Sequence, residues 1–132
     1  MSTVKYYDWS YHQARTRPNK VAVKEVSTGR ETTYGQLEER SCRLASWLQN
    51  KGVKKGDRVA ILIHNCTEVF ELEFACAKIG AIELPLNWRL TKPELEYILN
   101  DSSPEVLIYG SNFADTAKAL TKDCSIKNSL EI

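Results

Sequence analysis

The sequence predicts an α/β fold with three layers, in which helices cover both faces of a parallel sheet and a β-hairpin precedes the sheet. Two observations support this prediction. Short apolar runs without polar alternation recur along the chain, and such runs are typical of strands buried on both faces. Segments with helical spacing of apolar residues separate these runs. The resulting order, strand then helix repeated three times, indicates right-handed crossovers between parallel strands.

The start of the chain predicts a helix followed by the hairpin. Residues 4–16 are expected to form the helix, which has to end before Pro18 because the residue preceding proline avoids helical geometry. Apolar and polar side chains alternate over residues 21–26. A turn signal at residues 27–30 then precedes a short second run, residues 31–33. We therefore expect two antiparallel strands.

A longer helix is predicted from Tyr34 to Lys51. Thr33 and Gln36 have the spacing of a capping box, in which each side chain bonds the backbone of the other residue. Gly52 follows the last residue, where a left-handed residue commonly ends a helix. Apolar residues at helical spacing give this helix a single buried stripe, formed by Leu37, Leu44, Ala45 and Leu48.

The first fully apolar run, residues 59–63, is predicted as a buried strand. Asn65 and Glu68 have the spacing of a cap for the following helix, which should end at Gly80. The broad apolar face of this helix consists of Val69, Leu72, Ala75, Cys76 and Ile79. A second strand is predicted over residues 81–86.

The last third of the chain repeats this pattern. Thr91 and Glu94 form another capping-box pair, and the helix behind them is broken at residues 100–104. Residues 106–109 are predicted as the third buried strand, and residues 113–120 as the last helix. No linker or change of composition divides the chain. Residues 1–132 are therefore expected to form a single domain.

The composition disfavours several functional classes. With 18 basic and 17 acidic residues the formal net charge is +1, so no charge excess indicates binding to nucleic acid. No apolar run reaches the roughly 20 residues of a membrane-spanning helix, and the first residues do not resemble a signal peptide. The four cysteines are widely spaced and only two histidines accompany them. We therefore expect reduced thiols, no metal site and a cytoplasmic location.

Several short segments resemble, in the same order, the amino-terminal part of the AMP-forming acyl-CoA synthetases of the adenylate-forming superfamily. The segments are residues 18–23 (PNKVAV), 32–37 (TTYGQL), 56–61 (GDRVAI), 77–87 (AKIGAIELPLN), 88–91 (WRLT) and 97–101 (YILND). The second is similar to the family's Thr-Tyr-x-Glu-Leu signature, with Gln36 at the position of the usual glutamate. The fourth matches a signature of Gly-Ala and Pro-Leu-Asn type. The resemblance covers roughly residues 18–120.

This resemblance implies a carboxylate–CoA ligase, which joins a fatty or other carboxylic acid to AMP with Mg-ATP and then passes the acyl group to CoA. The family's phosphate-binding loop of S-G-T-T-G-x-P-K type has no counterpart here, because the six glycines are scattered. Its magnesium-binding segment and its catalytic lysine also have none. We therefore expect a partial subdomain of the adenylate-forming fold with no catalytic residue and no cofactor of its own. Its partner would be the remainder of the synthetase.

Arg89 is the candidate site residue. It follows a predicted strand end, and in some members of the family the matching arginine contacts a phosphate of CoA. A guanidinium there would bind phosphate oxygens in a planar, paired geometry. The alternative, which we favour at this point, is a surface arginine paired with Glu94 or Glu96. His64 and Trp88 also follow strand ends, and packing roles are expected for both.

The acidic stretch of the second long helix is expected to be a solvated face. Glu68, Glu71 and Glu73 point to different sides of a helix, and no histidine or cysteine completes a ligand set around them.

Other functions remain open. A truncated product could serve as a non-catalytic binding or interaction module. A small nucleotide-binding protein of flavodoxin-like topology is disfavoured because no phosphate loop follows any strand. We also expect a homodimer or a larger assembly. The sheet formed by residues 59–63, Leu84 and residues 106–109 is expected to lose neighbours at Ile132. Strands left at its open edge would expose unpaired backbone groups beside apolar side chains.

Overall fold

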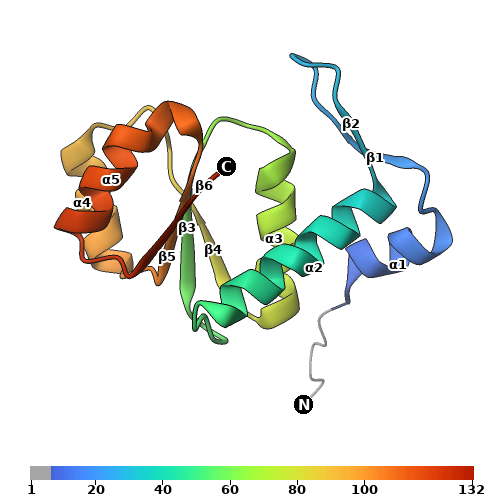
Figure 1. The fold of residues 1–132 in the computed structure, drawn as a ribbon, viewed down its shortest axis with the longest axis horizontal. Coiled ribbons are helices and arrows are strands. Elements are labelled where there is room, and N and C mark those ends of the chain that lie inside the picture. The colour runs from blue at the N-terminus through green and yellow to red at the C-terminus, as the bar shows by residue number, and fades with distance from the viewer. Residues whose placement is uncertain (1–6) are drawn as a thin grey trace.

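The computed structural model describes residues 7–132 and has a parallel sheet between two helical layers (Figure 1). The sheet order is β4-β3-β5-β6, and every neighbouring pair is parallel. The strands are β3 (Arg58–Leu62), β4 (Ile82–Pro85), β5 (Val106–Tyr109) and β6 (Asn128–Glu131). The three strands predicted from apolar runs are confirmed. The sequence prediction lacks β6, because the residues NSLE contain no apolar run.

Two helices cover each face of the sheet (Figure 1). One layer contains α2 (Tyr34–Asn50) and α3 (Thr67–Ile79), and the other contains α4 (Lys92–Ser102) and α5 (Ala114–Asp123). Alternate residues of β3 belong to the two cores. Val59 and Ile61 pack with α2 and α3, whereas Ala60 and Leu62 pack with α4 and α5. None of these four is more than 2% exposed, which explains the apolar run without alternation.

Local signals set the ends of α2 as predicted. The Gln36 N–H donates to Thr33 Oγ1 at 3.3 Å, and the Thr33 N–H donates to Gln36 Oε1 at 2.9 Å. At the other end Gly52 has a φ of 88°, and the Val53 N–H donates to the Leu48 carbonyl at 3.1 Å. None of the helices within residues 7–132 has the length and apolar character needed to cross a membrane.

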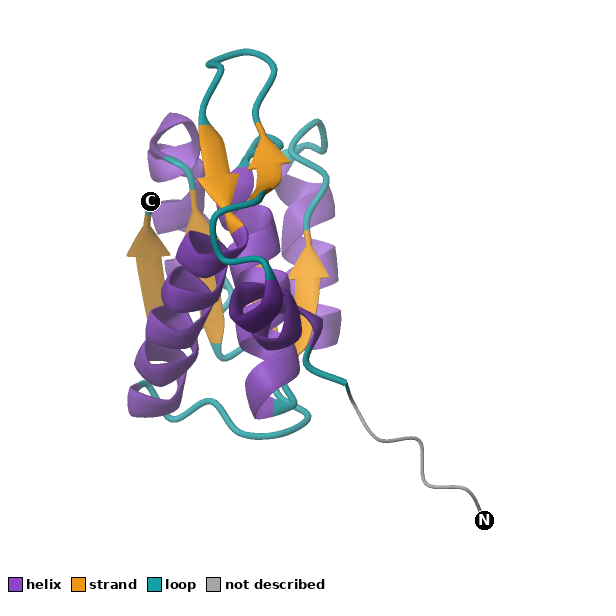
Figure 2. Cartoon of the chain, turned by 90° about the vertical axis from the view of Figure 1, so that its right-hand side faces the viewer, coloured by secondary structure: helices purple, strands orange, loops and turns teal. Residues whose placement is uncertain are grey.

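The amino-terminal elements lie outside the three layers. The predicted helix over residues 4–16 is present as α1 (Trp9–Thr16), and residues 4–6 lie outside the described part of the chain. The hairpin of β1 (Val21–Lys24) and β2 (Glu31–Thr33) is antiparallel, as predicted. Figure 2 shows the hairpin at the end of the molecule toward which the parallel strands point. It therefore lies near the loops that follow those strands.

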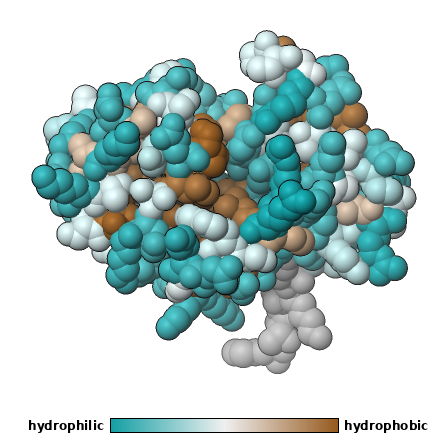
Figure 3. All heavy atoms as spheres, viewed as in Figure 1, coloured by the Kyte–Doolittle hydropathy of each residue, from teal (hydrophilic) through white to brown (hydrophobic). Residues whose placement is uncertain are grey.

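The edge strands are β4 and β6, and this corrects the reasoning about association. Of the strands that we expected at an open edge, β3 and β5 are inside the sheet and paired on both sides, and only β4, which contains Leu84, is at an edge. Both edge strands are only partly buried. In Figure 3 apolar residues gather in a band between the two helical layers. Beside β6, Leu44, Leu130 and Ile132 surround a small hollow of about 90 Å³.

Candidate functional site

The carboxyl ends of the parallel strands meet at one edge of the sheet, which is where open α/β sheets bind ligands. Three loops leave this edge. His64 follows β3, Trp88 and Arg89 follow β4, and Phe113 ends the 3₁₀ helix η1 (Ser111–Phe113) after β5. The fold thus brings together side chains from three separate loops.

These four side chains form a stack, here called the aromatic column. The His64 ring contacts Phe113 with a centroid distance of 4.9 Å and an interplanar angle of 65°. On its other side it meets Trp88 at 4.5 Å and 85°, an edge-to-face contact. The Arg89 guanidinium carbon lies 4.2 Å from the Trp88 ring centroid, in cation–π geometry. Phe113 itself packs against the core beneath α4 and α5.

The predicted pairing of Arg89 with Glu94 or Glu96 is wrong. The Glu94 carboxylate accepts from the Thr91 N–H and hydroxyl, both at 2.7 Å, at the start of α4. Glu96 Oε1 lies 2.9 Å from Lys92 Nζ. Among residues 7–132, no acidic side chain lies within 4.0 Å of the Arg89 guanidinium. Arg89 is exposed, so its hydrogen-bond donors are available to an anion.

A hollow of about 260 Å³ opens beside His64. It is lined by the loops after β3 and β5, the start of α3 and the hairpin, with Arg30, Ile63, His64, Cys66, Asn112 and Phe113 among its lining residues. Gly110 at the end of β5 packs closely against the Ile63 side chain. A Cβ there would lie 2.9 Å from Ile63 Cγ1, so glycine lets the two strand ends approach.

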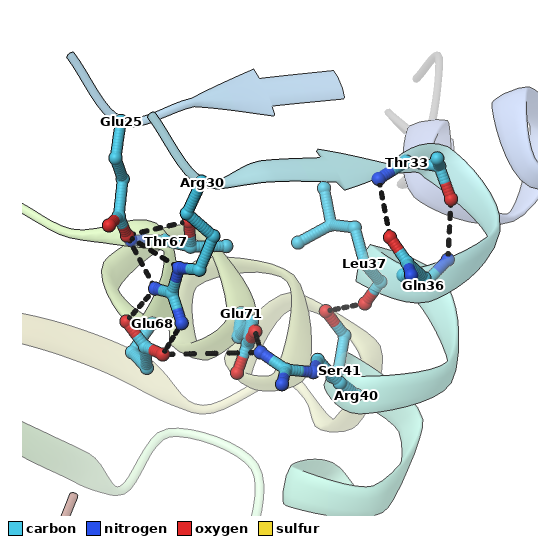
Figure 4. Close-up of polar contacts among 10 residues, drawn as sticks. All are labelled: Glu25, Arg30, Thr33, Gln36, Leu37, Arg40, Ser41, Thr67, Glu68 and Glu71. Carbon is cyan, nitrogen blue, oxygen red and sulfur yellow. Dashed lines mark hydrogen bonds and ion pairs between the residues drawn. The ribbon is translucent and has the colours of Figure 1, made fainter. Parts of the chain in front are cut away.

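An ion-pair cluster at the rim of this hollow, here called the hairpin clamp, fixes the β-hairpin to α3 (Figure 4). Arg30 Nη1 donates to Glu68 Oε1 at 2.8 Å, and Nη2 donates to Glu68 Oε2 at 2.7 Å, a bidentate pair. Arg30 also bonds Glu25, whose pKa falls to about 2, first through that bond and then through bonds from Thr67. The same carboxylates raise the pKa of Arg30.

Glu25 also caps α3, and this corrects the predicted cap. The N-cap residue is Cys66, not Asn65, and its side chain makes no capping hydrogen bond. Glu25 Oε1 instead accepts from the Thr67 N–H at 2.8 Å and from its hydroxyl at 2.9 Å. A carboxylate at a helix amino terminus is stabilised by the unpaired N–H groups and the helix dipole. No spacing signal in the sequence identifies this cap, because the residues lie 42 positions apart.

The acidic residues of α3 do not form a solvated face as predicted. Glu71 is only 8% exposed, and its Oε1 accepts from Arg40 Nη1 of α2 at 2.8 Å (Figure 4). Glu68 belongs to the hairpin clamp, and Glu73 alone of the three is exposed. Within the part of the chain that the structure describes, no group of three or more His, Cys, Asp or Glu residues is placed to hold a metal ion.

The thiols of α3 are poor nucleophiles. Burial raises the pKa of Cys66 to about 11, with a further contribution from Glu68. Burial also raises the pKa of Cys76 to about 12. Because the thiolate is the reactive form, both side chains remain inert near neutral pH. The strand ends thus combine an exposed cation, Arg89, with an aromatic surface.

In open α/β sheets, ligands bind outside the carboxyl ends of the strands, and Arg89 lies at this position. Comparison with known proteins gives the family. The chain belongs to the family of AMP-binding enzymes, whose pattern matches residues 10–131. The recognised resemblance to acyl-CoA synthetases is therefore confirmed.

Several of the similar proteins are CoA ligases. The chain is 43% identical over 112 residues to a feruloyl-CoA synthase of an Amycolatopsis species, covering 85% of this chain and 22% of that protein. It is 39% identical over 118 residues to the long-chain-fatty-acid–CoA ligase FadD13 of Mycobacterium tuberculosis, covering 89% and 24%. The solved N-terminal domain of FACL13 from M. tuberculosis superposes with a TM-score of 0.87 at 34% identity, covering 97% of this chain and 34% of that one. The chain thus spans about a quarter of the length of the curated relatives that it matches.

Proposed function

We propose that the chain is the amino-terminal segment of a carboxylate–CoA ligase, an incomplete domain that supplies scaffold and one contact to CoA. The whole enzyme would convert ATP, a carboxylic acid and CoA into acyl-CoA, AMP and pyrophosphate. The family match and the relatives that are CoA ligases support this reaction class. ATP with Mg²⁺ would be used by later segments and not by this one, whose described residues form no cluster suited to a metal ion. A cytoplasmic location is part of the proposal.

Arg89 would bind a phosphate group of CoA. The observation behind this assignment is the exposed guanidinium on Trp88, at the carboxyl ends of the strands, without a carboxylate partner among residues 7–132. Stacking on an aromatic face leaves the N–H donors at the guanidinium edge free for phosphate oxygens.

The two half-reactions of the whole synthetase test this assignment. Arg89→Ala should raise the KM for CoA by roughly ten-fold, because losing one charge-assisted contact at an exposed site costs about 1–2 kcal/mol. Pyrophosphate release in the first half-reaction should be unchanged, since CoA takes no part in it. Arg43→Ala, which removes an exposed arginine of α2, is the control. Equal damage to both half-reactions by Arg89→Ala would mean that Arg89 is structural.

The reading frame beyond residue 132 separates this proposal from a non-catalytic module. A downstream sequence encoding the glycine-rich phosphate loop supports the synthetase. A stop codon followed by an intact unrelated gene favours the module.

We also propose that the isolated chain self-associates through a sheet edge. The apolar surface beside β6, where Leu130 and Ile132 lie, supports this, together with the unpaired backbone groups of an edge strand. Light scattering on a size-exclusion peak across a dilution series should show a dimer or larger particle. A monodisperse 15.0 kDa particle at every concentration would contradict self-association.

A further inference from the structure

We propose that His64 is a positioning residue: its contact holds the Trp88 ring in place, and the Trp88 ring in turn holds the Arg89 guanidinium in a position to bind phosphate. The phosphate role rests on the proposed function, whereas the ordering of Arg89 by His64 does not. The relevant observation is that the column has four members from three loops, and that each contacts the next.

An exposed arginine without a partner is normally mobile. Its long side chain has many rotamers, and ordering them on binding reduces affinity. Arg89 is exposed, yet its guanidinium carbon lies 4.2 Å from the Trp88 centroid. Its own backbone is also fixed, since the Arg89 N–H donates to Asn87 Oδ1 at 3.1 Å. A guanidinium that is already ordered loses less side-chain conformational entropy when it binds phosphate.

Trp88 can hold Arg89 only if its own ring is held. Trp88 is 36% exposed, so much of this residue is not restrained by packing. The edge-to-face contact with His64 at 4.5 Å supplies a restraint. The His64 ring also contacts Phe113, which packs with the core beneath α4 and α5. The column therefore connects an exposed cation to the core through two aromatic contacts.

The shape of the imidazole ring, rather than its proton chemistry, carries this role. Its contacts in the column are with ring faces and edges, at interplanar angles of 85° and 65°. Another flat ring of similar size should therefore serve. This gives a matched pair of variants: His64→Ala removes the ring, and His64→Phe replaces it with another aromatic ring.

The first test measures the order of Arg89 directly in the chain of 132 residues. The ¹⁵N relaxation of the Arg89 Nε–H group should indicate an ordered guanidinium in the wild type. His64→Ala should bring its heteronuclear NOE down toward that of the exposed Arg17, and His64→Phe should restore most of it. Thermal unfolding of both variants checks that the fold is retained. An unchanged Arg89 signal in a folded His64→Ala chain would overturn the proposal, and so would equal loss in both variants.

The second test links order to binding, with CoA as the probe and pantetheine, which lacks the phosphates, as its control. Chemical-shift titration should give an affinity for CoA that falls about three- to ten-fold in His64→Ala, the range expected for losing one aromatic pair. His64→Phe should recover most of this loss, and Arg89→Ala should remove the preference over pantetheine. If Arg89→Ala binds CoA as the wild type does, or the wild type shows no preference, the proposed phosphate contact is wrong. If Arg89→Ala weakens binding but His64→Ala does not, the positioning role is wrong and the contact stands.

Discussion

A buried carboxyl group on β4 should make the chain less stable as the pH rises toward neutrality. Glu83 lies opposite Val59 in the parallel pair of β3 and β4, and Val59 belongs to the core under α2 and α3. Its Oε1 is buried and has no hydrogen-bond partner among residues 7–132. Burial, and secondly the nearby charge of Glu73, raise the pKa of Glu83 from 4.5 to about 7.

The sign of the effect follows from proton binding. Between pH 4.5 and 7 the folded chain keeps the Glu83 proton, whereas the unfolded chain has released it. The free energy of unfolding therefore decreases as the pH rises through this window. Below pH 4.5 Glu83 is protonated in both states and does not change the free energy of unfolding. A shift from 4.5 to about 7 corresponds to about 3 kcal/mol if unscreened. Because the Glu83 side chain is only partly buried, solvent screening should reduce this to about 1–2 kcal/mol.

Glu83→Gln should remove this dependence, since the amide does not ionise. Urea unfolding followed by tryptophan fluorescence from pH 4.5 to 8 should show the variant gaining about 1–2 kcal/mol on the wild type as the pH rises. Glu131→Gln, an exposed position on the other edge strand, is the matched control and should follow the wild type. Parallel curves for the wild type and Glu83→Gln across this window would refute the reasoning.

Two further predictions concern the hairpin clamp and a helix end. Glu25→Gln should lower the melting temperature at pH 7. The difference in melting temperature should shrink as the pH falls from 4.5 toward 2. The contribution of the Glu25 carboxylate is complete above its unfolded pKa of 4.5 and is lost as the pH falls to its folded pKa of about 2. A difference independent of pH would contradict this. Gly80→Ala should cost about 1–2 kcal/mol in urea unfolding, because Gly80 has a φ of 72°. Gly29→Ala is the control, because Gly29 has the same φ and an added Cβ there would have no neighbour within 4 Å. A larger loss of stability at Gly80 would measure the crowding by Lys55 Cγ, which would lie 2.9 Å from the added Cβ. Equal losses of stability would mean that Lys55 moves aside.

The sequence predicted those parts of the fold that rest on local signals. The capping box of Thr33 and Gln36 needs only residues three positions apart, and the unbroken apolar run of β3 reports burial on both faces. β6 has neither kind of signal. It is a strand because β5 offers it a parallel partner, with Ile108 opposite Leu130. Strands that depend on tertiary pairing of this kind are not visible in a single sequence.

The sequence pointed to Arg89 as a candidate residue but did not predict its contacts. The strand end and the family resemblance both indicated Arg89. The expected ion pairs of Arg89 were wrong, because Glu94 accepts a hydrogen bond from Thr91 and Glu96 pairs with Lys92. The stacking of His64 on Trp88 depends on how loops after β3 and β4 converge, which no spacing encodes. The same holds for Glu25 as the cap of α3.

Our central proposal is that this segment contributes a CoA contact but lacks the adenylation chemistry of its family. Pyrophosphate release from ATP, measured with a panel of fatty acids and the chain purified to homogeneity, tests it most directly. We expect no carboxylate-dependent release, because the sequence lacks the phosphate-binding loop and the catalytic lysine of the family. Release that depends on the carboxylic acid and stays with the chain through every purification step would contradict the account.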